Sequence, residues 1–247
     1  MTRKSIFGGL LAAIMMSGLA AAQNTEFGGT RYPQLQEIQT PDGQVAQFVI
    51  GQSAWGEVLS EVGLLRAEPA SRDREIAERL YSVRDTIPPA FLYESARRFA
   101  SFNPDQSVYV FLLARARTIY DARRCVDSTA VHGLPVMTDM AGAEVAALMN
   151  ITTDGQITPR TQRMQAALDR LLSSNDIFNS TASPWWICSG SDSAYYAAAN
   201  NAAMPQAEWL KGEALWPDIQ QSVIRNIREN QALLAITMGT RELTEQP

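Results

Sequence analysis

The chain has 247 residues, of which 46% are hydrophobic and 19% are charged, and its formal net charge at pH 7 is −5. This length suits one domain of ordinary size or two small ones, and the apolar content is sufficient for a buried core. The acidic balance disfavours nucleic acids and anionic membrane surfaces as partners.

The start of the chain has the pattern of a secretory signal peptide. Arg3 and Lys4 precede an apolar run over residues 6–19, and three alanines then provide a cleavage site after Ala22. The run is too short, and too interrupted by glycine and serine, to predict a membrane span, and no cysteine follows it to accept a lipid. We therefore expect an exported protein, periplasmic or secreted, without membrane insertion.

The next segments predict a short hairpin. Residues 23–34 are polar and contain glycine, which is typical of a flexible N-terminal arm. Two short β-prone runs then flank the sequence PDG, and an Asp-Gly pair between such runs predicts a β-hairpin over 35–50.

Helical spacing begins at Ser53. Apolar residues recur at three- and four-residue steps, which predicts a helix bounded by Gly63 and Pro69. A second helix is expected over 71–83, with Ser71 as its N-terminal cap.

The clearest pair of helices follows. Two prolines open a helix over 89–101, and the sequence NPD ends it and starts another over 105–125. The second helix is apolar on all sides in its first half, which is typical of a helix packed between neighbours. We expect it to form the centre of the core.

Beyond this pair the pattern is less regular. Residues 126–143 contain scattered glycine and proline and predict a loop, followed by a short helix over 143–149. The sequence NITTDGQITP, 150–159, predicts either a second small hairpin or a turn, and Pro159 opens a further helix.

The C-terminal third is again helical. One or two helices are expected before and after a break near Met204, then a last helix over 216–238 and a polar tail over 239–247. Many helices, at most two hairpins and no alternation of strands and helices predict a mainly α fold, with a single helical domain over 35–238.

The helix pair at about 88–125 resembles a tetratricopeptide-type helical hairpin, and the chain also resembles uncharacterised bacterial exported proteins. No second copy of the pair occurs at a fixed period, and the pair lacks the Gly/Tyr consensus of the repeat. The resemblance implies a helical fold and a module suited to binding a protein partner.

Two cysteines complete the structural predictions. Cys125 and Cys188 form an even pair, which in an oxidising compartment predicts one disulfide; two buried free thiols are the alternative. Such a bridge would stabilise the fold by about 4 kcal/mol in the chain-entropy account.

The stretch FLYESARRFASFNPDQS is similar to the segment that carries the catalytic glutamate of lysozyme-like lytic transglycosylases, which implies a proton-donor role for Glu94. The Gly-Leu-Met-Gln-like segment of that pattern is missing. Glu94 also lies about 200° around the helix from core-facing Leu92. Arg97 and Arg98 follow it by three and four positions, which favours ion pairing. We expect a surface ion pair, with a glycan-cleaving site at Glu94 as the alternative.

Other catalytic patterns are weak. The single His132 has no second histidine or reactive cysteine for a zinc site, and Ser189 and Ser191 lie in a glycine-flanked turn without a nucleophile motif. Phosphate-binding, dinucleotide-binding and calcium-binding motifs are missing from the sequence. We expect neither a metal nor a cofactor.

Two groups of residues are candidates for binding. Arginines crowd the 89–101 and 105–125 helices and would attract an acidic partner, unless they pair internally with Asp85, Asp121 and Asp127. Two neighbouring tryptophans would offer an aromatic platform, unless they lie in the core beside the disulfide. The candidate binding residues are Arg97, Arg98, Arg115, Arg117, Arg124, Trp185 and Trp186.

These observations favour an exported helical protein that acts by binding a protein partner, as an inhibitor or immunity protein or as an envelope scaffold. The oligomeric state stays open. The alternative is a cell-wall-active enzyme that uses Glu94.

Overall fold

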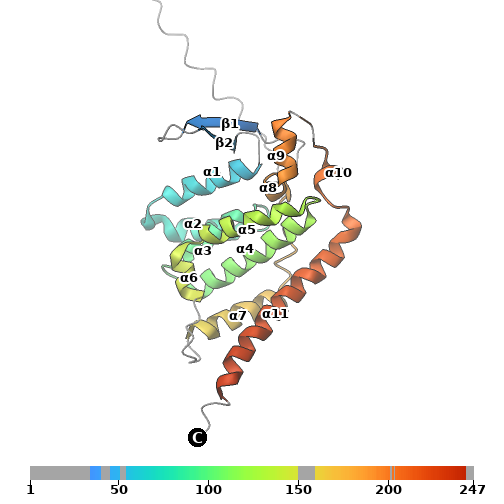
Figure 1. Cartoon of the computed structure of the whole chain (residues 1–247). Coiled ribbons are helices and arrows are strands. Elements are labelled where there is room, and N and C mark those ends of the chain that lie inside the picture. The colour runs from blue at the N-terminus through green and yellow to red at the C-terminus, as the bar shows by residue number, and fades with distance from the viewer. Residues whose placement is uncertain are drawn as a thin grey trace, which may run out of the picture.

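The computed structural model describes residues 34–39, 45–50, 54–149, 159–200, 202 and 204–242. The predicted signal peptide, nearly all of the N-terminal arm and the possible second hairpin lie outside these residues. The part that is described is mainly helical, as the sequence predicts, and helices α1 to α11 pack around a central helix, α4 (Figure 1).

Two short strands precede the helices. Strand β1 (Gln34–Gln39) pairs antiparallel with β2 (Val45–Ile50), in the register Gln34 opposite Ile50. The pair coincides with the segment where the sequence predicts a hairpin, and it lies over α1 and beside α9 (Figure 1).

Helix α1 (Ala54–Ala67) continues through Gly63 instead of ending there. Its valines Val58 and Val62 are fully buried, and this tertiary packing outweighs the modest cost of one glycine in a helix. Ser71 does not cap the next helix: it lies within a 3₁₀ turn over Ala70–Arg72, directly before α2.

The expected pair of helices is present. Helix α2 (Asp73–Ser82) leads into α3 (Ala90–Phe99), which packs along α4 (Pro104–Arg124). The Asn103 side chain caps α4 by accepting a hydrogen bond from the backbone N–H of Gln106 at 3.2 Å. Helix α4 also contacts α7, α11, α5, α6 and α8, which confirms its predicted place at the centre of the core.

The prediction of a loop over 126–143 is wrong. This segment contains a 3₁₀ turn over Ser128–His132 and α5 (Gly133–Met140), and α6 (Gly142–Met149) then begins close to the predicted position. Glycine and proline here occupy helix ends and first turns, where they do not interrupt hydrogen bonding. Gly142, with φ of +80°, makes the change of direction between α5 and α6.

The C-terminal third wraps around this core. Helix α7 (Pro159–Ser173) packs on α4, and the short α8 (Trp185–Cys188) and α9 (Asp192–Ala199) follow. Helix α10 (Gln206–Trp209) leads to α11 (Trp216–Glu242), which crosses α4 and α7. Helix α11 extends beyond the predicted end at residue 238, into the segment expected to be a polar tail, and projects past α7 (Figure 1).

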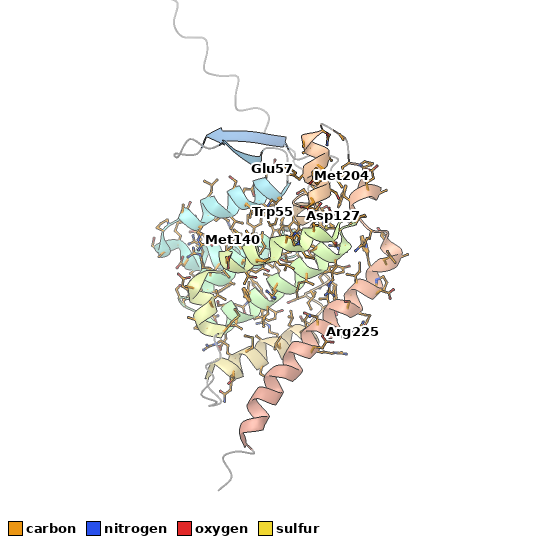
Figure 2. All side chains as sticks on the ribbon, viewed as in Figure 1. Trp55, Glu57, Asp127, Met140, Met204 and Arg225 are labelled. Carbon is orange, nitrogen blue, oxygen red and sulfur yellow. A yellow bond between two sulfur atoms is a disulfide. The ribbon has the colours of Figure 1, made fainter. Side chains whose placement is uncertain are left out.

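The predicted disulfide is confirmed. Cys125 and Cys188 are bonded, with their Cα atoms 5.4 Å apart, and both are buried. The bridge joins the end of α4 to α8. Trp55 of α1, labelled in Figure 2, stacks on Trp186 of α8 at 6.0 Å between ring centroids. Among the described helices, none is long and apolar enough to cross a membrane.

Candidate functional site

Glu94 is completely buried, with 0% of its surface exposed, and this corrects the prediction of a surface ion pair. The two arginine neighbours were predicted correctly. Arg97 donates to both carboxylate oxygens at 2.8 Å, from Nε and from Nη2, and Arg98 donates from Nε to Oε1 at 2.6 Å. Helix α3 contacts α1, α2, α4, α5 and α6. Arg98 binds the main-chain oxygen of Leu65 in α1, and Arg97 lies beside Gly142 of α6, so these two helices cover the side of α3 that carries Glu94.

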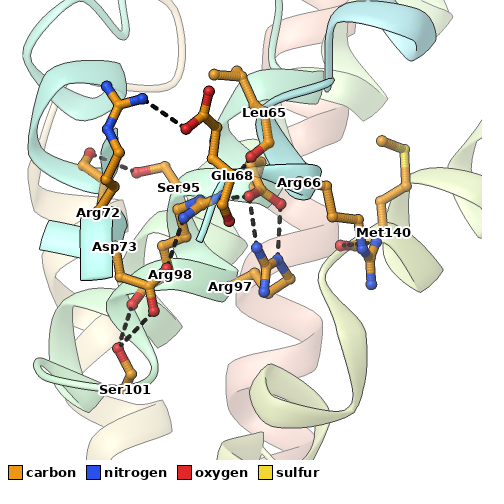
Figure 3. A network of polar contacts seen from close by, with 12 residues as sticks. Leu65, Arg66, Glu68, Arg72, Asp73, Ser95, Arg97, Arg98, Ser101 and Met140 are labelled. Carbon is orange, nitrogen blue, oxygen red and sulfur yellow. Dashed lines mark hydrogen bonds and ion pairs between the residues drawn. The ribbon is translucent and has the colours of Figure 1, made fainter. Parts of the chain in front are cut away.

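Arg98 is the centre of a wider buried network (Figure 3). Besides Glu94, its guanidinium donates to Asp73 Oδ1 at 2.7 Å. It also donates to the main-chain oxygens of Leu65, and of Glu68 at 3.2 Å. Leu65 lies in the last turn of α1 and Glu68 directly follows the helix, in a region where main-chain oxygens lack helical partners. Arg98 therefore ties the end of α1 to α3 and α2.

This geometry does not suit Glu94 to act as a general acid. A general acid must come within hydrogen-bond distance of its substrate. Both Glu94 oxygens already accept hydrogen bonds from guanidinium groups, and no part of the side chain is exposed. The network is therefore best described as a structural one.

The arginines of α4 are held by partners within the chain. Arg117 is buried and donates to Asp85 Oδ1 at 2.5 Å and to the main-chain oxygen of Asp176 at 2.8 Å. Arg124 is buried and donates to Asp121 Oδ1 at 2.5 Å. The internal pairing with Asp85 and Asp121 that the sequence left open is thus present.

The remaining arginine candidates do not form a common surface either. Arg115 is exposed and donates to Thr138 Oγ1 at 3.2 Å, whereas the Arg97 side chain is only 18% exposed. The hydrogen bond with Glu94 raises the pKa of Arg97, so its charge is held firmly in place. The arginine surface expected from the sequence is therefore not assembled on these helices.

The paired tryptophans lie in the core, as is expected of aromatic residues beside a disulfide. Trp185 packs against Trp209 at 4.9 Å between ring centroids, and Trp186 donates from Nε1 to Asp121 Oδ2 at 2.7 Å. Burial raises the pKa of Asp121, although the Arg124 charge and the Trp186 hydrogen bond oppose this effect. Neither indole is available as a platform for a partner.

No metal centre is assembled in the part of the chain that the structure describes: it contains no group of three or more His, Cys, Asp or Glu side chains that could hold an ion. His132 is exposed at the end of a 3₁₀ turn. Ser191 caps α9 through the N–H of Ala194, and Ser189 Oγ accepts from the N–H of Trp55 at 3.0 Å. The two serines thus have structural contacts.

A hollow of about 500 Å³, lined mainly by residues with polar side chains, lies between the start of α4 and α7. Its charged groups are already engaged. Arg163 donates to Asp105 at 2.6 Å, and the Arg170 guanidinium stacks over the Tyr109 ring at 3.6 Å and donates to Gln106 at 2.9 Å. A ligand would have to displace these contacts.

The better candidate site is an apolar groove of about 620 Å³ between α1 on one side and α2 with the start of α3 on the other. It is lined by residues of 61–68, 79–83 and 86–91. Leu80 and Phe91 are nearly buried, whereas Leu64 is 71% exposed and Val83 is 41% exposed. Large apolar side chains exposed around a concave apolar surface are typical of a binding site.

The buried network and the groove share the end of α1. The main-chain oxygens of Leu65 and Glu68 accept from Arg98, while their side chains line the groove. Arg98 therefore fixes the main chain of two residues whose side chains form part of the groove. We call this surface the α1–α2 groove.

The sequence contained one signal for this groove that was not used. Leu64 and Leu65 are adjacent and lie about 100° apart around the helix, so both can border one surface although only one of them can lie near the core-facing valines. Leu65 is half-buried and Leu64 is exposed, so α1 has more apolar positions than its core-facing side can bury.

Known proteins provide no comparison for this site. The chain matches no family model, and neither a curated protein nor a solved structure matches it.

Proposed function

We propose that this protein binds a protein partner in the α1–α2 groove. The observation that carries the proposal is the exposure of Leu64 and Val83 beside a nearly buried apolar floor. Burying apolar surface stabilises a complex by about 25 cal/mol per Å², so two exposed aliphatic side chains can serve as anchors. Polar interaction alone would not require them.

The proposal includes export to the periplasm or secretion. Its support is the N-terminal pattern of Arg3, Lys4, an apolar run and a cleavage site after Ala22, together with the Cys125–Cys188 disulfide. Disulfides persist in oxidising compartments, so the bridge fits such a location. Two roles suit an exported binding protein: inhibition of an envelope-acting toxin or enzyme, and an envelope scaffold.

A groove-dependent capture experiment tests the proposal. The purified protein would be immobilised and exposed to a periplasmic extract, alongside Leu64→Asp, which places a charge in the groove. Leu215→Asp is the matched control, because Leu215 is 50% exposed in the 3₁₀ turn before α11 and does not line the groove.

The expected result is a protein captured at micromolar concentration by the wild type and by Leu215→Asp, and lost with Leu64→Asp. Capture that survives Leu64→Asp, or no saturable capture at all, would overturn the proposal.

A further inference from the structure

The α1 wall of the groove has a regular helical pattern. Glu61, Leu64, Leu65 and Glu68 follow one another at steps of three, one and three residues and line the groove together. This is the spacing of a single stripe along a helix, with two leucines in the middle and a carboxylate at each end. Such a stripe is suited to packing along a second helix.

The opposite wall differs in charge. Helix α2 contributes Arg79, and Val83 follows directly after its last residue; both are exposed. Both sides of the groove therefore contribute apolar side chains to its lining, with carboxylates on the α1 side and Arg79 on the α2 side.

Glu61 on α1 and Arg79 on α2 form no ion pair within 4 Å among the residues that the structure describes, although the charge of Arg79 helps to lower the pKa of Glu75. Glu68, by contrast, is bound by Arg72 at 2.6 Å. Glu75, one turn before Arg79, is also bound by Arg72, at 2.7 Å. The groove thus offers one acidic and one basic group on opposite edges of an apolar floor.

We propose that the occupant of the α1–α2 groove is an amphipathic α-helix of the partner protein, with a basic residue on the edge that faces Glu61 and an acidic residue on the edge that faces Arg79. This inference rests on the proposed function, and it specifies the chemistry of the partner. A ridge of apolar side chains on such a helix would insert between Leu64 and Val83.

The shape of the site favours a helix over the other occupants. Both walls are built mainly by helices, and strands β1 and β2 are absent from the lining, so no strand edge is offered for pairing. A second copy of this chain would place a concave surface against a concave surface and leave a void between them. A convex helix fills the groove instead.

Synthetic peptides test this directly. The probe is a fluorescent, alanine-rich peptide of about 20 residues, long enough to form a helix, with leucines spaced as one stripe. Lysines lie along one flank of the stripe and glutamates along the other. Its control has two central prolines, which prevent the helix. Binding would be followed by fluorescence anisotropy with the purified protein.

The helical peptide is expected to bind the wild type and Leu215→Asp with a Kd of about 100 μM or tighter, corresponding to about 5 kcal/mol. Binding to Leu64→Asp should be at least about tenfold weaker, because a buried carboxylate replaces an apolar anchor. The proline peptide should not bind.

The two charged edges are tested by single reversals. Glu61→Lys replaces the carboxylate of the α1 side that has no ion pair with an ammonium group, so this variant should prefer a peptide with glutamate on both flanks. Arg79→Glu makes both edges acidic, so it should prefer lysine on both flanks. Each preference is expected to be about threefold, the size of an exposed ion pair. Unchanged rankings in both variants would overturn the assignment of charges.

The outcomes separate this inference from the proposed function. If extract yields a groove-dependent partner but helical and proline peptides bind equally, or neither binds at about 1 mM, the helix is wrong and the binding function stands. If the helical peptide binds but extract yields no groove-dependent partner, the chemistry of the groove stands and the proposed function falls. A wild-type dimer that Leu64→Asp dissociates would show a second copy as the occupant and would overturn the inference.

Discussion

The buried network around Arg98 and the α1–α2 groove both involve the C-terminal end of α1, but the network binds its main chain and the groove uses its side chains. On the inner side, the main-chain oxygens of Leu65 and Glu68 are bound by a guanidinium that is itself fully enclosed. On the outer side, the side chains of the same residues line a surface open to a partner. The buried hydrogen bonds of Arg98 thus fix the main chain that carries part of the apolar groove.

The difference follows from the cost of burial. A charge removed from water must be fully paired, and Glu94, Arg98 and Asp73 satisfy one another with short hydrogen bonds. An exposed leucine has no such requirement, so Leu64 can stay exposed in the absence of a partner without lowering the stability of the fold. The inner side should therefore control stability, and the outer side should control binding.

Loss of the buried charge should have the largest effect. Glu94→Gln leaves Arg97 and Arg98 without their shared carboxylate in a buried position, and we expect the free energy of unfolding to fall by about 3 kcal/mol. Glu78→Gln is the matched control, because Glu78 pairs with Arg74 at 3.2 Å on the surface, and it should change stability by less than about 0.5 kcal/mol. Equal effects in denaturant unfolding would remove the distinction between the two sides.

Arg98→Lys tests whether the network also shapes the groove. A lysine ammonium cannot reach two carboxylates and two main-chain oxygens with the planar geometry of arginine, and we expect a loss of about 2 kcal/mol. Amide hydrogen exchange should accelerate at the end of α1, and binding of the helical peptide should weaken. Unchanged exchange there would mean that the two sides are independent. Arg74→Lys is the surface control.

Asp127 accepts several hydrogen bonds but is only partly buried, so we expect it to contribute less to stability than Glu94. Its burial would raise the pKa, but hydrogen bonds from Ser193 and Thr129 outweigh this and hold the pKa of Asp127 well below its usual range. Because the folded-state pKa is lowered, the stabilisation is present above about pH 4 and is lost as the pH falls toward that lower value.

Asp127→Asn should therefore lower stability at pH 7 by only about 1 kcal/mol, because the carboxylate is largely solvated. The difference from the wild type should shrink as the pH falls from about 5 to 3. Asp139→Asn, at an exposed position of α5, is the control. A difference that stays constant with pH would contradict this account of Asp127.

The smallest effect on stability should come from the groove itself. Leu64→Asp replaces a side chain that is 71% exposed, so the free energy of unfolding should change by less than about 0.5 kcal/mol. This variant should lose partner binding all the same. A large loss of stability would show that Leu64 belongs to the core and would undermine the groove as a separate surface.

Much of the fold could be predicted from local patterns. The Asn103–Pro104 boundary, the apolar periodicity of α4 and the cysteine pair each depend on a few neighbouring residues or on composition. The segment 126–143 could not be predicted, because its glycine and proline occupy helix ends there and resemble loop formers in isolation. The resemblance of the α3–α4 pair to a tetratricopeptide hairpin stays a prediction.

The candidate site shows the same division. The sequence by itself determined that Glu94 projects away from Leu92 and toward two arginines, because helical geometry fixes directions around one axis. Only the tertiary structure decided that α1 and α6 cover that side, which made a predicted surface pair a buried one. It also decided that Leu64 borders a groove, since a groove exists only where α1 and α2 diverge. The phase of one helix carries no information about what lies opposite it.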